Sequence, residues 1–148
     1  PTKIHCVGAS HLTPSVVDFL SSFLGFNGSV SAGMQTSWLS PFKEHRLTVT
    51  GSAGALVFDD TKPWPEKLTL FHDQMHLDGD HFLIDRASPI TLQLTEAEPL
   101  KAEMQAFIDS CDNDSPAVTD INEAIAVQQV LEMLQKNLID TLLKPEIR

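Results

Sequence analysis

Three basic residues lie close together in an otherwise acidic chain. Lys43, His45 and Arg46 follow Pro41 within a few positions. Ammonium and guanidinium groups donate strong hydrogen bonds to carboxylates and phosphates, so this cluster could bind the anionic part of a substrate, such as a sugar diphosphate or a uronate. A solvated strand edge explains the same pattern, because a cation near a strand end usually faces water. Lys43, His45 and Arg46 are therefore the candidate substrate-binding residues.

A second segment, from His72 to His81, is rich in groups that bind metals. It holds the imidazoles of His72, His76 and His81, together with three aspartates. Imidazole nitrogens and carboxylate oxygens are common ligands of divalent cations. The spacing matches no closed zinc pattern, however, and a solvated acidic loop explains the composition without a ligand. We therefore predict no metal site, and these three histidines are the candidates if one exists.

Two further sets of residues have side chains that could take part in chemistry. Ser10, His11 and Asp18 are the residue types of a catalytic triad, but no nucleophile-elbow motif surrounds a serine. Trp38 and Trp64 could stack on ligand rings, yet large aromatic side chains more often serve packing. We predict that no residue of this chain is catalytic and that both tryptophans are packing residues.

The strands of a sheet must position these residues. Two apolar segments, at 47–49 and 55–58, flank Gly51-Ser52-Ala53-Gly54, where glycine permits a tight turn, so a hairpin is expected. Asn27-Gly28 predicts another hairpin, between strands at 16–24 and 30–39. With Asn27 and Gly28 as the two loop residues, Phe19 would oppose Thr36 and Phe23 would oppose Ala32.

That register gives the 16–24 strand two different faces. One would be apolar and is predicted to be the core beneath the helices; it contains Val17, Phe19, Phe23 and, across the hairpin, Trp38. The other face, with Asp18, Leu20 and Ser22, would be mixed and small. The sequence leaves open whether this second face lies against water or against a sheet of another subunit.

The remaining pattern predicts the fold class. Further strands are expected at 3–7, 46–51, 55–59, 67–72 and 90–94, with 73–80 as a loop, and short turns between strands favour antiparallel pairing. After Pro99, apolar residues recur at helical spacing, which predicts a first helix. Asp120, with Glu123 three residues later, is typical of the N-terminus of a second helix. We predict one α+β domain over residues 1–148, an open, mainly antiparallel sheet with the two C-terminal helices on one face.

Composition restricts the partners and the compartment. The chain has 148 residues and a formal net charge of −10, which would repel nucleic acids and anionic membranes. No segment approaches the ~18 apolar residues of a membrane helix. Two cysteines far apart, Cys6 and Cys111, form no disulfide framework, which favours a cytoplasmic protein.

The order of these patterns carries a family resemblance between about Ser15 and Leu134. The residues that carry it are Ser37-Trp38-Leu39, Pro41-Phe42-Lys43, Arg46-Leu47, Val49, Gly51, Gly54, Val57-Phe58-Asp59-Asp60, Glu98-Pro99-Leu100-Lys101-Ala102-Glu103, Phe107-Ile108 and Thr119-Asp120. In them the chain resembles the Gfo/Idh/MocA family of NAD(P)-dependent sugar oxidoreductases. Within that family it is most similar to the UDP-N-acetylglucosamine 3-dehydrogenase branch.

The resemblance implies that this chain is the C-terminal domain of a two-domain enzyme. Such a domain binds a sugar or nucleotide-sugar substrate and forms homo-oligomers through its open sheet face. The N-terminal Rossmann domain, which would bind NAD or NADP, is expected to be a separate part of the full-length protein, since no GxGxxG occurs here. The family's Glu-Lys-Pro motif is absent as well, because Glu66-Lys67 is followed by Leu68. The domain is therefore expected to bind no cofactor and to be inactive alone.

Two other interpretations stay open at this point. The chain could be a free-standing, non-enzymatic binding or scaffold module that keeps the fold. It could also be a metal-dependent enzyme that uses the segment from His72 to His81.

Overall fold

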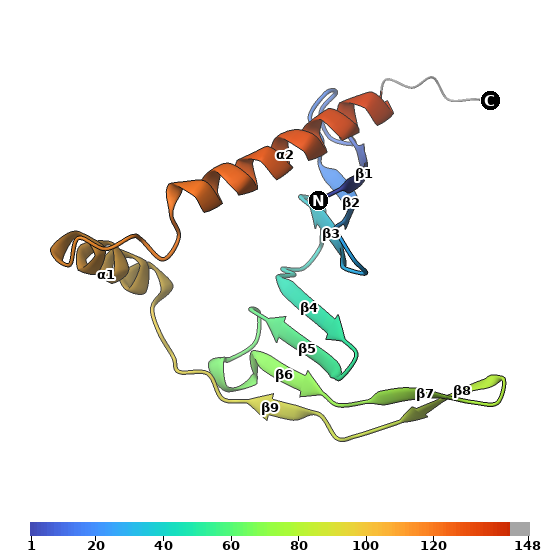
Figure 1. The fold of residues 1–148 in the computed structure, drawn as a ribbon. Helices are drawn as coiled ribbons and strands as arrows, with labels where there is room; N and C mark the ends of the chain where they lie inside the picture. The colour runs from blue at the N-terminus through green and yellow to red at the C-terminus, as the bar shows by residue number, and fades with distance from the viewer. Residues whose placement is uncertain (143–148) are drawn as a thin grey trace. The chain divides into compact units, whose positions relative to one another are not determined.

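The computed structural model describes residues 1–142, with side chains described to residue 140. These residues form two compact units: Pro1–Ser40 with the described part of Met104–Arg148, and Pro41–Glu103. Both units contain antiparallel strands, and two helices, α1 (Pro99–Asp112) and α2 (Ile121–Leu142), follow the strands in sequence (Figure 1). The predicted α+β class, with antiparallel strands and two helices, is confirmed.

A three-stranded sheet and α2 form the packed part of the first unit, which also includes α1 from Met104. Its strands are β1 (Lys3–Ala9), β2 (Phe19–Gly25) and β3 (Ser31–Ser37), in that order. The buried core consists of Cys6 on β1 with Leu134 and Leu138 on α2, and the partly buried residues packed against it are Ile4, Val17, Leu20, Leu24 and Val130. The backbone N–H of Cys6 also donates a 2.7 Å hydrogen bond to Oδ1 of Asn137, which links the strand to the helix.

The predicted register between β2 and β3 is wrong by one residue. Phe19 pairs with Ser37 and Phe23 with Gly33, not with Thr36 and Ala32. The reason is the length of the connection: Phe26 N–H donates to the carbonyl of Val30 at 3.0 Å, so three residues lie between these partners instead of two. A shift of one residue exchanges which side chains of β3 share a face with those of β2.

The predicted core face of β2 is also wrong. The helix covers the face that carries Leu20 and Leu24, whereas Phe23 on the opposite face is 50% exposed. The pairing with β1 explains this choice, because Ile4 and Cys6 lie on the covered face, while polar residues such as His5 pair with the opposite face. Burying the apolar side chains of β1 therefore decides which face of β2 becomes the core.

The second helix begins where the sequence predicts. Oδ1 of Asp120 accepts the backbone N–H groups of Asn122 and Glu123, at 2.8 and 3.0 Å, as an N-cap residue does. Of the leucines on this helix, Leu134 and Leu138 are buried, while Leu131 is half exposed. Within residues 1–142, no helix has the length and apolar character that crossing a membrane requires.

A four-stranded antiparallel sheet makes up most of the second unit. Its strands are β4 (Arg46–Gly51), β5 (Gly54–Asp59), β6 (Leu68–Phe71) and β9 (Ile90–Leu92), in this order, and a short 3₁₀ helix, η1 (Trp64–Glu66), lies between β5 and β6. The predicted hairpin at Gly51–Gly54 is confirmed. Gly54 has a φ of 142°, and a Cβ there would collide with the backbone carbonyl of Phe71, so only glycine fits.

The segment predicted to be a loop, 73–80, is instead part of a hairpin. Strands β7 (Gln74–Asp78) and β8 (His81–Asp85) pair across a turn at Gly79 and Asp80. Gly79 has a φ of 60°, as the first loop residue of a type II′ turn requires. The strands of the described residues therefore form three hydrogen-bonded sheets, not the single sheet that the sequence suggested.

Candidate functional site

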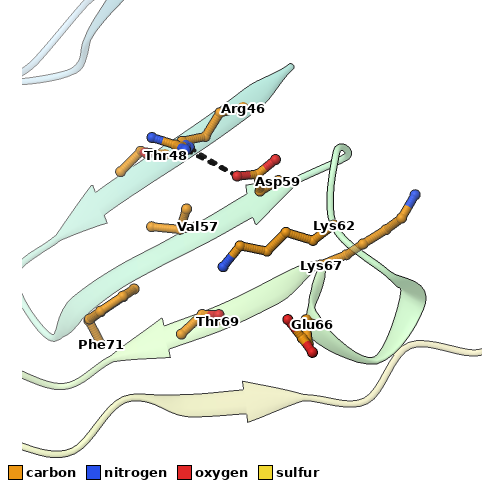
Figure 2. A pocket seen from close by; sticks show the side chains of 9 residues that line it. All are labelled: Arg46, Thr48, Val57, Asp59, Lys62, Glu66, Lys67, Thr69 and Phe71. Atoms are coloured by element: carbon orange, nitrogen blue, oxygen red, sulfur yellow. Dashed lines mark hydrogen bonds and ion pairs between the residues drawn. The ribbon is translucent and has the colours of Figure 1, made fainter. Parts of the chain in front are cut away.

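One face of the four-stranded sheet, the polar face, carries the side chains that could bind a ligand. Alternate residues of a strand share a face, so Arg46 and Thr48 on β4 lie with Val57 and Asp59 on β5, and Thr69 on β6 follows (Figure 2). Together they border a pocket of about 280 Å³, which is lined by Arg46, Thr48, Val57, Asp59, Lys62, Glu66, Lys67, Thr69 and Phe71.

An ion pair between β4 and β5 forms one wall of this pocket. Nη2 of Arg46 lies 3.1 Å from Oδ2 of Asp59, whose side chain is nearly buried. Oδ1 of Asp59 accepts the hydroxyl of Thr61 at 2.6 Å and its backbone N–H at 3.1 Å. These hydrogen bonds from Thr61, with a smaller effect of Arg46, lower the pKa of Asp59 to about 2. Asp59 therefore stays ionised at neutral pH.

A second polar cluster lies beside the first. Oδ1 of Asp60 accepts a 2.6 Å hydrogen bond from Nζ of Lys67, and Oδ2 lies 3.2 Å from Nδ1 of His45. Lys67, followed by His45, lowers the pKa of Asp60. The ammonium of Lys67 also lies 4.5 Å from the ring centroid of Trp64, within the range of a cation–π interaction. This cluster fixes the position of Lys67 at the pocket.

The residues of the pocket are suited to binding an anion with hydroxyl groups. Arg46, Lys62 and Lys67 bring three positive charges to the pocket; Arg46 is paired with Asp59 and Lys67 with Asp60, and Glu66 adds a further carboxylate. The hydroxyls of Thr48 and Thr69 can both donate and accept hydrogen bonds. Phosphate and carboxylate groups are the ligands that such a donor set recognises.

The structure distributes the three predicted binding residues differently. Arg46 lines the pocket. His45 is bonded to Asp60, and Lys43 lies in the exposed segment before β4; neither is among the lining residues. Sequence reasoning missed Lys62 and Lys67. Lys67 directly precedes β6, and its alternation with Thr69 and Phe71 could have placed it on this face.

The predicted packing role is wrong for one of the two tryptophans. The ring of Trp64 contacts the ammonium of Lys67, as described above. Trp38, by contrast, is 87% exposed. An indole in water is stabilised by no packing, so Trp38 needs another explanation.

Two histidines of the acidic segment, His76 and His81, lie on the β7–β8 hairpin, and His72 precedes β7. Nδ1 of His76 lies 3.4 Å from Oδ2 of Asp85, while His81 pairs across the strands with Asp78. Among the side chains that the structure describes, no group of three or more His, Cys, Asp or Glu residues is close enough to hold a metal ion. His72, His76 and His81 are therefore not brought together.

The His11 and Asp18 pair has a structural role. Nδ1 of His11 lies 2.7 Å from Oδ1 of Asp18, and Oδ2 accepts the backbone N–H groups of His11 and Leu12 at 2.6 and 2.8 Å. Burial alone raises the pKa of Asp18, but the hydrogen bonds from His11 and Leu12 outweigh it, so the pKa is lower than usual. The carboxylate thus pins the segment between β1 and β2.

Comparison with known proteins identifies a shared fold. No protein-family model matches the chain, and no curated protein sequence matches it either. Among solved structures, UDP-N-acetylglucosamine 3-dehydrogenase GnnA from Acidithiobacillus ferrooxidans is similar, with a TM-score of 0.72 and 15% sequence identity. The match covers 92% of this chain and 39% of that one. The chain therefore has the fold of a part of that enzyme and spans about two fifths of its length.

Proposed function

We propose that this chain is the substrate-binding and oligomerisation domain of an NAD(P)-dependent sugar oxidoreductase. The observation that carries the proposal is the likeness in fold to UDP-N-acetylglucosamine 3-dehydrogenase over 92% of the chain. The sequence resemblance to Gfo/Idh/MocA enzymes points the same way. Since a fold alone does not determine a substrate, the substrate class is argued from the pocket.

The substrate in this proposal is a nucleotide sugar, such as a UDP-N-acetylhexosamine or the corresponding uronate. Its diphosphate or carboxylate binds at Arg46, Lys62 and Lys67, and its hydroxyls bind at Thr48 and Thr69. The net charge of −10 gives the protein a field that repels anions, so a local group of cations is needed to bind one. Such a group lines the pocket of the four-stranded sheet.

The chemical step in this proposal takes place with another part of the full-length protein. A Rossmann domain would hold NAD or NADP there, and that cofactor would supply the hydride-transfer chemistry. The printed sequence has no GxGxxG, the glycine-rich turn that holds a dinucleotide pyrophosphate. The present domain therefore binds the substrate and the sister subunit, and it has no turnover by itself.

Calorimetric titration of the purified domain tests the proposal. We expect UDP-N-acetylglucosamine to bind and NADH to give no heat of binding. Lys62→Ala removes one cation from the pocket without breaking the Arg46–Asp59 pair, and we expect about tenfold weaker binding of the nucleotide sugar, equivalent to about 1.4 kcal/mol. Arg46→Ala should weaken binding at least as much.

Arg86→Ala is the matched control. Arg86 is an exposed arginine that lies 3.5 Å from Asp73, so its removal changes the net charge by the same amount outside the pocket. We expect wild-type affinity for this variant. Equal losses in the Lys62 and Arg86 variants would show a general charge effect, and micromolar binding of NADH would contradict the division of roles.

A further inference from the structure

A second hollow lies in the first unit, at the end of β3. It has a volume of about 360 Å³ and is lined by Val17, Asp18, Phe19, Thr36, Ser37 and Trp38. Trp38 is 87% exposed, although burying an aromatic side chain removes roughly 150–250 Å² from water. An indole that borders a hollow of this size offers a flat apolar face on which a ligand ring can stack.

The backbone under this indole is firmly held. Trp38 N–H donates to the carbonyl of Asp18 at 2.9 Å, and the hydroxyl of Ser37 donates to the same oxygen at 3.3 Å. The side chain of Asp18 is in turn bonded to His11 and Leu12. The exposed ring therefore stands on an anchored backbone, as a binding platform does when it is formed before the ligand arrives.

The polar groups of the hollow select among the ligands that can stack on an indole. None of its six lining residues is cationic, and Asp18 is a carboxylate with a lowered pKa, so a phosphate-bearing ligand would be repelled. The hydroxyl of Thr36 can donate to and accept from ligand hydroxyls, and that of Ser37, which already donates to the Asp18 carbonyl and accepts from Leu39 N–H, can accept one more hydrogen bond. The negative face of an aromatic ring attracts the polarised C–H groups of a saccharide ring.

We propose that this hollow binds a neutral pyranose, stacked on Trp38 and hydrogen-bonded to Thr36 and Ser37. The site does not depend on the function proposed above. It differs in chemistry from the pocket of the four-stranded sheet, because that pocket collects cations and this hollow has none.

Tryptophan fluorescence gives a direct test. The chain contains two tryptophans and no tyrosine, so Trp64→Phe leaves Trp38 as the only indole. In this variant we expect N-acetylglucosamine to shift the emission of Trp38 to shorter wavelength, saturably, with a Kd of about 1 mM. UDP alone should cause no shift. In calorimetry, Trp38→Ala should abolish binding of N-acetylglucosamine, and Thr36→Val should weaken it severalfold.

Three outcomes would overturn the proposal. They are the absence of a saturable shift with N-acetylglucosamine, an equal shift with UDP, which would indicate stacking of a nucleobase, and unchanged binding in Trp38→Ala. Because Trp38 is exposed, its replacement should leave the circular dichroism spectrum unchanged. Binding of UDP-N-acetylglucosamine should be weakened in Lys62→Ala and kept in Trp38→Ala, because its diphosphate is excluded from this hollow.

Discussion

Arg46 and Asp59 are direct partners across β4 and β5, and Nη2 of the arginine lies 3.1 Å from Oδ2 of the aspartate. The aspartate is only 6% exposed, while the arginine reaches water at the mouth of the pocket. A buried carboxylate needs partners, and Arg46 and Thr61 supply them. The pair therefore fixes the arginine at the pocket and makes the polar face sensitive to acid.

Acid should weaken the second unit through Asp59. The pKa of this group is depressed from its usual 3.8 to about 2, so its contribution to stability is full above pH 3.8 and is lost as the pH falls towards 2. We expect the urea midpoint of the wild type to fall over this range and that of Asp59→Asn to fall less. Circular dichroism at fixed urea steps measures both.

Asp85→Asn is the control for this experiment, because Asp85 is exposed and lies 3.4 Å from His76. We expect it to lose stability with pH as the wild type does. Parallel curves for the wild type and Asp59→Asn would show that the Asp59 hydrogen bonds contribute nothing to the pH dependence.

The core beneath α2 predicts which truncations lower the free energy of unfolding most. Leu134 is 5% exposed in the core between α2 and β1, so Leu134→Ala should cost about 2–5 kcal/mol of the free energy of unfolding. Leu131 on the same helix is half exposed and is the matched control, for which we expect a small loss. Phe23→Ala should be mild as well. A loss for Phe23→Ala as large as that for Leu134→Ala would mean that the face assignment is wrong.

Short sequence motifs predicted the turns and caps whose conformation depends on their own residues. The Gly51–Gly54 hairpin and the cap at Asp120 followed from glycine conformation and from a side-chain acceptor. The register of β2 and β3 did not, because one backbone hydrogen bond, from Phe26 to Val30, lengthens the connection by a residue. The β7–β8 hairpin was wrongly predicted as a loop, because the polar composition of 73–80 outweighed the alternation of Met75 and Leu77.

The candidate site was predictable only in part for a different reason. Arg46 stands out in sequence as a cation at a strand start. Lys67 reaches the same pocket because β6 pairs with β5. A turn and a 3₁₀ helix separate these two strands, and no short sequence motif predicts their pairing. Asp59 likewise acquires its low pKa from Thr61 and Arg46, which the fold brings to it.

Gly54 should be irreplaceable, whereas Gly33 should not. At Gly54 the φ of 142° and the nearby carbonyl of Phe71 leave no place for a Cβ, so Gly54→Ala should cost about 1–3 kcal/mol or more. At Gly33 a Cβ would meet nothing within 4 Å, and Gly33→Ala should be close to neutral. Thermal unfolding compares the two. Equal melting temperatures would contradict the strained geometry at Gly54.

The apolar face of the four-stranded sheet provides the test of oligomerisation. Leu47, Val49 and Ile90 lie on the face opposite the pocket and are 61%, 56% and 47% exposed. In the proposed oligomer a second copy covers this face, because exposed contiguous apolar surface favours association.

Light scattering should give a dimer or larger species for the wild type and a monomer for Val49→Glu, since the new carboxylate would have to be buried without a partner. Val118→Glu makes the same change at an 86% exposed position between α1 and α2 and should leave the mass unchanged. A wild type that stays monomeric at high concentration would refute association through this face, and equal dissociation in both variants would show that charge alone drives the subunits apart.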